Sequence, residues 1–218
     1  MAPRVRVKIC GVTNEADARQ AALLGADAVG LNFCAGSPRR IDEGTAAYIL
    51  RELPPFVEAV GVFAGQPLRE VWPVLNRLGR VRTAQVHGGP RELCDAFPFQ
   101  LICAFQVRDA SGLTEVTRYL DVARRMGRLP AAVLVDGYAP GQHGGTGRAA
   151  PWDLLADLHL DVPLILAGGL TPENVAEAVR RVRPYAVDVA SGVERAPGHK
   201  DPERVRRFLD AVREAEAG

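Results

Sequence analysis

Short apolar runs alternate with helix-like stretches along the whole chain. Each run is rich in Val, Ile and Leu and alternates little with polar residues, which is typical of strands buried on both faces. The runs are Val5–Cys10, Ala28–Phe33, Val57–Phe63, Thr83–Val86, Leu101–Val107, Ala131–Val135, Val162–Ala167 and Ala186–Ala190. The pattern predicts eight short strands, each followed by a helix, in a parallel sheet.

Three of the intervening helices carry start or stop signals. Thr13–Glu15 precedes a helix that ends at Gly25. A second helix is predicted to begin at Thr171–Asn174, where a capping residue is followed by a proline and an acidic residue. A third follows Asp201–Glu203 and continues through Val212.

Eight strands and eight helices in unbroken alternation predict one α/β domain over residues 1–218. We expect a single (β/α)8 TIM barrel around a parallel eight-stranded sheet. The competing architecture is an open doubly wound sheet, which needs fewer strands and usually carries a G-x-G-x-x-G fingerprint after the first strand. Here the first strand runs into Cys10-Gly11-Val12-Thr13, which lacks that fingerprint, so the barrel is favoured.

Composition sets broad limits on function. The chain is 47% hydrophobic and has a net charge of +1, which indicates neither a nucleic-acid partner nor a membrane surface. No apolar run is long enough to cross a bilayer, and the N-terminal residues lack the apolar region of a signal peptide. We therefore expect a cytoplasmic protein that acts on a small molecule.

The cysteines do not indicate a metal site. Cys10, Cys34, Cys94 and Cys103 form no C-x-x-C pair, and their spacing with the four histidines does not match a zinc site. In a reducing compartment we expect these residues to be thiols. The sequence thus predicts no bound metal.

Two glycine-containing segments indicate a phosphate pocket. Ala167–Leu170 and Asp188–Val193 each pass from an apolar run into small residues. In a parallel α/β barrel, the loops after the last two strands and a helix N-terminus present backbone N–H groups to an anion. Glycine matters there because a Cβ would keep the backbone away from the phosphate oxygens. We expect a small phosphorylated ligand.

Two groups at predicted strand ends are candidates for proton transfer. Cys10 ends the first strand, where a thiol can act as a base if its pKa falls toward neutrality. Lys8 shares its strand face and either favours the thiolate or forms a structural ion pair. Asp136 follows the apolar run Ala131–Val135 and, when partly desolvated, can serve as an acid. The alternatives are an inert buried cysteine and a carboxylate that caps a loop.

Other polar residues follow predicted strands. Arg39 lies in the long loop after the second strand, where it either holds a carboxylate in a bidentate fork or faces solvent. The segment Gly144–Gly147 is a candidate for a loop that closes over a ligand. His87 follows the fourth strand, and a hydrogen-bonded structural role is its favoured interpretation.

The ordered set of these segments resembles the phosphoribosylanthranilate isomerase family of tryptophan biosynthesis. The matching motifs cover the chain from about Val5 to Lys200. They are Val7–Thr13, Gly25–Gly30, Ser37–Arg39, Val60–Phe63, Gln85–Gly88, Val135–Asp136, Gly144–Gly147, Ala167–Val175 and Val187–Glu194. One motif alone would be weak, whereas the ordered set is specific.

The resemblance implies a role for each candidate residue. Cys10 is the implied general base, Asp136 the general acid, and Arg39 the residue that holds the anthranilate carboxylate. Asp188 is implied to help orient the substrate. The phosphate is expected on the loops that contain Gly168, Gly169, Ser191 and Gly192, and the loop that closes over the substrate contains Gly145 and Gly147. The implied reaction is a cofactor-free isomerisation, in a monomer or a homodimer.

Three positions depart from the family pattern: Cys34 where a bulkier residue is usual, His143 near the acid, and Phe105 in a region that often carries a lysine. Two other functions stay open. A related sugar-phosphate isomerase of the histidine-biosynthesis type would tend to use two aspartates, which Cys10 disfavours. A phosphate-binding barrel without catalysis would have no use for both Cys10 and Asp136.

Overall fold

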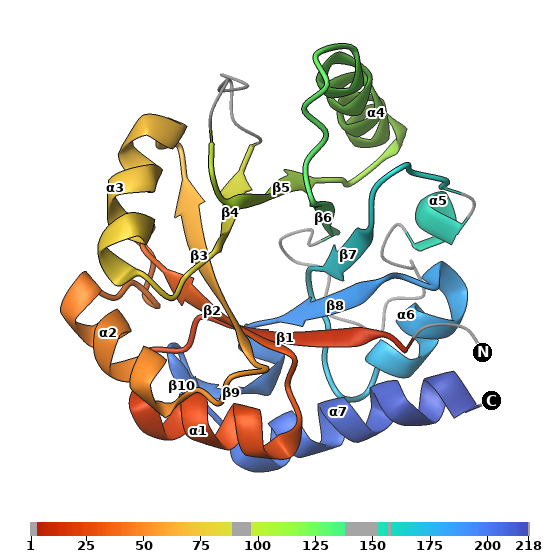
Figure 1. Cartoon of the computed structure of the whole chain (residues 1–218). Coiled ribbons are helices and arrows are strands. Elements are labelled where there is room, and N and C mark those ends of the chain that lie inside the picture. The colour runs from red at the N-terminus through yellow and green to blue at the C-terminus, as the bar shows by residue number, and fades with distance from the viewer. Residues whose placement is uncertain (1–3, 89–96, 138–151, 157, 218) are drawn as a thin grey trace.

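The computed structural model describes residues 4–88, 97–137, 152–156 and 158–217. Within these residues, eight parallel strands close into a barrel, because each strand pairs with the next and β1 also pairs with β8 (Figure 1). The strands are β1 (Arg6–Cys10), β2 (Ala28–Asn32), β3 (Glu58–Ala64), β4 (Thr83–His87), β5 (Gln100–Gln106), β6 (Ala132–Asp136), β7 (Leu164–Ala167) and β8 (Ala186–Val189). The predicted TIM barrel is confirmed, and the open sheet is wrong.

Seven α-helices lie around the barrel in the described part of the chain (Figure 1). They are α1 (Glu15–Leu24), α2 (Glu43–Glu52), α3 (Leu68–Leu78), α4 (Ala110–Arg125), α5 (Trp152–Ala156), α6 (Val175–Val182) and α7 (Pro202–Ala217). The helix expected between β4 and β5 involves residues 89–96, which lie outside the described residues. None of the described helices is both long enough and apolar enough to span a membrane.

The alternation of side chains along the strands produces two apolar cores. Residues of one parity fill the inside of the barrel, because the lumen of eight strands is just wide enough for side chains to fill it. This inner cluster comprises Val60, Ile102, Ala104, Ala132, Leu134, Ile165, Ala167 and Ala186. Residues of the other parity, such as Ile9, Val29 and Phe63, pack with the helices in a larger outer core.

Helix ends explain why the chain turns where it does. The Asn14 side chain accepts a hydrogen bond from Asp17 N at 2.8 Å, and α1 ends at Gly25, which has a left-handed φ of 103°. Both predicted signals of this helix are confirmed. At the other end of the chain, α7 begins at Pro202, inside the segment Asp201–Glu203 that the sequence placed before this helix, and Asp201 accepts hydrogen bonds from Glu203 N and Arg204 N.

One helix begins later than predicted. Helix α6 begins at Val175, and Thr171–Asn174 forms a turn before it. The reason is the Asn174 side chain, whose oxygen accepts from Thr171 N at 2.8 Å and whose amide group donates to Gly169 O at 2.9 Å. These bonds stabilise the loop after β7 instead of capping the helix.

A small hairpin between β8 and α7 was not predicted. The chain forms the short 3-10 helix η1 (Ser191–Val193), then the antiparallel strands β9 (Glu194–Ala196) and β10 (His199–Lys200) (Figure 1). The hairpin is joined to the corner between β1 and α1, because Thr13 donates to Gly198 O and Lys200 N donates to Asp17 Oδ2 at 2.8 Å. A segment near the C-terminus therefore lies beside the first strand.

Candidate active site at the barrel mouth

Cys10 and Asp136 both lie at the end of the barrel where the strands terminate. Cys10 is the last residue of β1, and Asp136 is the last residue of β6. Alternate residues of a strand point into the barrel. On β6, Asp136 alternates with the inner residues Ala132 and Leu134. On β1, Cys10 is two residues from Lys8, whose ammonium lies inside the barrel. Both side chains are half-buried. The fold thus brings the two predicted proton-transfer groups to one rim, on strands separated by β7 and β8.

A glycine on β2 makes room for the Cys10 thiol. Gly30 is level with Cys10 in the parallel pairing of β1 and β2. A Cβ at Gly30 would lie 2.7 Å from Cys10 Sγ and 3.0 Å from Cys10 Cα, which is closer than carbon side chains pack. The position of the thiol therefore requires glycine at this place on the neighbouring strand.

A buried ion pair lies deeper in the barrel than the thiol. Lys8 Nζ is 2.8 Å from Asp188 Oδ1 and donates to Gln85 Oε1 at 2.9 Å. Gln85 in turn contacts His87 at the rim, with 3.2 Å between their Nε2 atoms. Burial opposes the charge of Lys8, but Asp188 and Cys10 raise its pKa above the ordinary value. Lys8 therefore forms a structural ion pair, which is one of the two roles that the sequence allowed for it. Its partner is Asp188, which is itself a predicted site residue.

The pKa of Cys10 is raised above its ordinary value, first by burial and then by the negative charge of Asp188. Lys8 and Lys200 act in the opposite direction and favour the thiolate, but they do not outweigh the other two effects. The surroundings of the thiol therefore raise its pKa and do not lower it toward neutrality. The sequence shows a lysine beside the thiol, but it does not show that Asp188 approaches from the far end of the chain.

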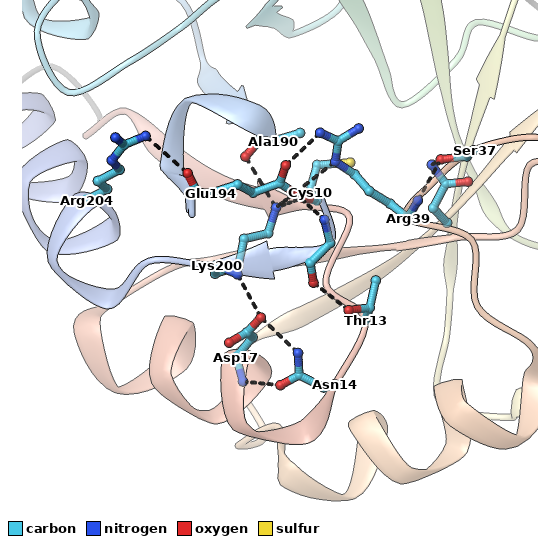
Figure 2. A network of polar contacts seen from close by, with 12 residues as sticks. Cys10, Thr13, Asn14, Asp17, Ser37, Arg39, Ala190, Glu194, Lys200 and Arg204 are labelled. Carbon is cyan, nitrogen blue, oxygen red and sulfur yellow. Dashed lines mark hydrogen bonds and ion pairs between the residues drawn. The ribbon is translucent and has the colours of Figure 1, made fainter. Parts of the chain in front are cut away.

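Arg39 reaches the rim from the loop between β2 and α2, and Glu194 of β9 holds its side chain (Figure 2). Arg39 Nε donates to Glu194 Oε1 at 2.8 Å, and Arg39 Nη2 donates to Glu194 Oε2 at 2.6 Å. The Arg39 stem lies over the main chain next to the thiol, since a Cβ on Gly11 would collide with it. Arg39 is thus a fixed residue, not a solvated one.

Lys200 lies at the centre of the polar network in Figure 2. Its Nζ donates to the main-chain oxygen of Cys10 at 2.6 Å, to Glu194 Oε1 at 2.7 Å and to the main-chain oxygen of Ala190 at 3.3 Å. The side chain is 2% exposed. Because these acceptors belong to the ends of β1 and β8 and to β9, one buried ammonium joins three segments at the rim.

Glu194 and Lys200 are site residues that sequence reasoning missed. Both are buried and charged, yet in the sequence they read as ordinary polar residues between the last strand and the last helix. A usable signal was their position, because they lie directly after the segment predicted to bind phosphate. A glutamate and a lysine in a short polar segment directly after the last barrel strand are close enough in the sequence to reach the rim.

The loops after β7 and β8 touch through their main chains at the same rim. Gly168 and Gly169 have φ angles of 91° and 64°, in the left-handed region that favours glycine. Gly192 approaches the next loop so closely that a Cβ there would collide with Leu170 O. Ser191 begins η1 and is exposed. The four residues predicted to bind phosphate thus lie on two adjacent loops.

Two of the departures from the family pattern are visible in the structure. The Phe105 ring packs against Tyr119 of α4, with 5.3 Å between ring centroids, so this side chain lies under a helix and not at the mouth. Cys34 Sγ is 3.6 Å from Val62 O, and burial raises the pKa of this thiol to about 11. Phe105 thus lies away from the rim, whereas the Cys34 thiol interacts electrostatically with Cys10.

Three predicted residues lie outside the described part of the chain: Gly145 and Gly147, expected in a loop that closes over the substrate, and His143. Across the part of the chain that is described, no group of three or more His, Cys, Asp or Glu side chains is arranged to hold a metal ion.

The fold and this rim define the chain as a (β/α)8-barrel protein with a thiol, a carboxyl group and two touching glycine-containing loops at the end where barrel enzymes act. Comparison with known proteins defines the family. Residues 7–211 match the family model described as N-(5'phosphoribosyl)anthranilate (PRA) isomerase, and the chain belongs to this family.

Close relatives and solved structures agree with this assignment. The chain is 47% identical to N-(5'-phosphoribosyl)anthranilate isomerase of Geobacter sulfurreducens, over 94% of this chain and 97% of that one. It is similar to the crystal structure of phosphoribosyl anthranilate isomerase from Thermotoga maritima, with a TM-score of 0.84, 37% identity and coverage of 96% and 99%. A further structure of such an isomerase, with a TM-score of 0.80, 35% identity and coverage of 96% and 99%, is a complex with reduced 1-(o-carboxyphenylamino)-1-deoxyribulose 5-phosphate.

Proposed function

We propose that the protein isomerises N-(5'-phosphoribosyl)anthranilate to 1-(o-carboxyphenylamino)-1-deoxyribulose 5-phosphate in tryptophan biosynthesis. The observation that carries the proposal is the presence of Cys10 and Asp136 on one rim of a barrel of this family. The ligand in the similar crystal structure is the reduced form of that product. Substrate and product have the same composition, so the reaction only moves protons and electron pairs within one molecule.

The two side chains divide the proton transfers. Asp136, in its protonated form, donates to the ribose ring oxygen while the bond from that oxygen to C1 breaks, and the nitrogen lone pair forms a C=N bond. The positive nitrogen of this iminium acidifies the proton on C2. The Cys10 thiolate removes that proton, the freed electron pair forms the C1=C2 bond of an enolamine, and the second electron pair of the C=N bond returns to the nitrogen. Each positioned proton transfer typically contributes about 10²–10⁴-fold to the rate.

The enolamine then becomes the ketone when C1 gains a proton and the C2 hydroxyl loses one. The base must be the thiolate, and the raised pKa of Cys10 makes this form harder to reach than for an ordinary thiol. Lys8 and Lys200 favour the thiolate and so support this step. A base with a high pKa is present at a lower fraction but is intrinsically stronger.

The same rim provides the binding groups. We assign the substrate phosphate to the main-chain N–H groups of the two touching loops, which contain Gly168, Gly169, Ser191 and Gly192. Arg39 binds the anthranilate carboxylate, and Asp188, held by Lys8, orients the substrate.

The proposal uses no metal and no redox cofactor, because general acid and base catalysis accounts for every proton that moves. The protein acts in the cytoplasm as a monomer or a homodimer. Its proposed partner is a small phosphorylated molecule, and the proposal includes no nucleic acid and no membrane.

A fluorescence assay tests the proposal. Loss of the anthranilate conjugate is followed in a coupled system, with the corresponding aminosugar phosphate of histidine biosynthesis as a second substrate. We expect turnover of the anthranilate conjugate. Turnover of the second substrate alone would favour the related isomerase, and binding of a phosphorylated ligand without any turnover would favour a non-catalytic barrel.

Substitution of the two proton-transfer groups tests their roles. We expect Cys10→Ala and Asp136→Asn to fold normally and to lose at least about a hundredfold in kcat, which is the usual size of such a contribution. Arg39→Ala should instead raise KM. Wild-type turnover in either of the first two variants would show that the assigned role is wrong.

A further inference from the structure

Glu194 uses only part of the hydrogen-bonding capacity of Arg39. A guanidinium has five N–H donors in a planar fork, and these form two edges that can each bind a carboxylate. Glu194 occupies the edge made by Nε and Nη2. The edge made by Nη1 and Nη2 has no protein acceptor among the described residues, so it is left for a second carboxylate.

Glu194 is itself fixed. Its carboxylate side chain is 4% exposed, and Oε1 accepts from Lys200 Nζ at 2.7 Å and from Gly198 N at 3.3 Å, in addition to Arg39. Lys200 in turn is tied to main-chain oxygens at the ends of β1 and β8. The orientation of the Arg39 fork is thus set relative to the strand that carries Cys10.

We infer that Glu194, anchored by Lys200, is a positioning residue that aims the free edge of Arg39 at the substrate carboxylate. This inference rests on the proposed function, since it assumes that Arg39 binds that carboxylate. Without Glu194 a long, flexible arginine would have to lose its conformational freedom when the substrate binds, and affinity for the carboxylate would fall. Glu194 touches Arg39 and not the reacting atoms, so it acts through Arg39.

Glu194→Gln is the most selective change. An amide oxygen in place of Oε1 keeps an acceptor for Lys200, Gly198 N and Arg39 Nε, whereas the amide NH2 in place of Oε2 would face the Arg39 Nη2 donor. The variant therefore keeps the hydrogen bonds that hold residue 194 to Lys200 and Gly198, and it loses one of the two hydrogen bonds to Arg39. Arg204→Ala is the matched control, because Arg204 donates to the main-chain oxygen of Glu194 and does not contact Arg39 (Figure 2).

The experiment measures the dissociation constants of two compounds by calorimetry. One is reduced 1-(o-carboxyphenylamino)-1-deoxyribulose 5-phosphate, and the other is the same compound without the ring carboxyl group. In Glu194→Gln we expect the first compound to bind at least about tenfold more weakly, the loss typical of a hydrogen bond to a charged group, and the second to bind as to the wild type. In Arg204→Ala both constants should stay unchanged.

A double-mutant cycle shows whether the effect passes through Arg39. In the Arg39→Met background, Glu194→Gln should cause no further loss for the carboxylate compound. Should Glu194→Gln fail to fold, Glu194→Asp, which keeps the charge but not the reach, is measured with the same two compounds and the same expected difference.

Several outcomes would overturn the inference. Equal weakening of both compounds would mean that Glu194 only stabilises the fold, and tighter binding of the carboxylate compound would mean that Glu194 competes for Arg39. Unchanged binding of both would show that Arg39 needs no positioning. If the wild type binds the compound with the ring carboxyl group more tightly but turns over no substrate, the proposed function is contradicted and this inference is not. Normal turnover together with an unchanged preference in Glu194→Gln contradicts this inference alone.

Discussion

At the scale of single residues, the chemistry of Cys10 depends on opposing charges brought from distant parts of the chain. Burial disfavours the thiolate most, Asp188 also disfavours it, and Lys8 and Lys200 favour it. Arg39 and Cys34 also interact with this thiol electrostatically. The result is a thiol whose pKa lies above the ordinary value, so the fraction of thiolate depends strongly on pH.

The first prediction concerns that pH dependence. The rate at which a small alkylating reagent modifies the Cys10 thiol should rise by about tenfold per pH unit below its pKa, because each unit raises the thiolate fraction tenfold and this reaction does not require protonated Asp136. In Asp188→Asn the loss of the negative charge should move this rising limb to lower pH. The measurement is the rate of Cys10 modification against pH for both proteins, followed by mass spectrometry, with circular dichroism as a control for folding. A limb that stays in place or moves to higher pH would contradict this account of the thiol.

Gly30 gives a steric test of the same thiol. A methyl group in Gly30→Ala would lie 2.7 Å from Cys10 Sγ, so the sulfur or its strand has to move. A misplacement of about 1 Å can cost about a hundredfold in rate, and we expect a loss of that order in kcat. Gly44→Ala in α2 is the control, because its nearest neighbour is Asp42 Oδ1 at 3.5 Å and it is expected to keep full activity. Equal activity of the two variants would show that the thiol position is not critical.

Sequence reasoning located Cys10, Asp136 and Arg39 because each follows a short buried strand, and strand ends converge in a barrel. It could not give the pKa of Cys10 or the partner of Arg39. Those depend on Asp188 and Glu194, which lie close to the rim only after the barrel closes between β1 and β8. Position along a strand is readable from the sequence, whereas contacts across the barrel are not.

At the scale of elements, the loops after β7 and β8 form one surface because their main chains touch at Gly192 and Leu170. The strands before these loops were predicted well, since continuous apolar runs are a strong signal. The turn at Thr171–Asn174 and the hairpin of β9 and β10 were not predicted as they are. The turn depends on bonds between the Asn174 side chain and nearby main chain, and the hairpin on bonds from Lys200 to Asp17 and Cys10, far away in the sequence; no periodic pattern predicts such bonds.

A substitution at Gly192 tests this surface. In Gly192→Ala the new methyl group would collide with Leu170 O, so the two loops must separate and their N–H groups no longer converge. We expect inorganic phosphate to become at least about tenfold weaker as a competitive inhibitor, the loss typical of hydrogen bonds to a charged group. Ser191→Ala leaves the main chain in place and should cost less. An inhibition constant that is unchanged in Gly192→Ala would mean that phosphate binds elsewhere.

At the scale of the whole molecule, the first and last parts of the chain hold each other in place. β1 pairs with β8, α1 packs against α7, and the hairpin before α7 is tied to β1 by Lys200 (Figure 1). Buried charges lie at this junction, and they link its stability to pH. Burial opposes the charge of Glu194, but the hydrogen bonds from Arg39 and Lys200 outweigh it and lower the pKa of Glu194.

Acid stability is the corresponding prediction. Because the pKa of Glu194 is lower in the folded state than in the unfolded chain, its stabilising effect is complete above the unfolded value. That effect is lost as the pH falls through the folded value. Urea unfolding of the wild type between about pH 6 and pH 3 should therefore show a steeper loss of stability than unfolding of Glu194→Gln, which cannot titrate there. Identical pH slopes in the two proteins would show that Glu194 is not linked to folding in this way.

The buried pair of Lys8 and Asp188 has a consequence for attempts to make this barrel more heat-resistant. Two charges taken out of water stabilise a fold little, and well-packed apolar replacements of both are often neutral or stabilising. A screen that rewards survival on heating, with no demand for turnover, would therefore tend to remove these two residues together. The more heat-resistant proteins from such a screen would lack the two charges that act on the Cys10 thiol. Selection for heat resistance and selection for activity should therefore diverge first at this pair.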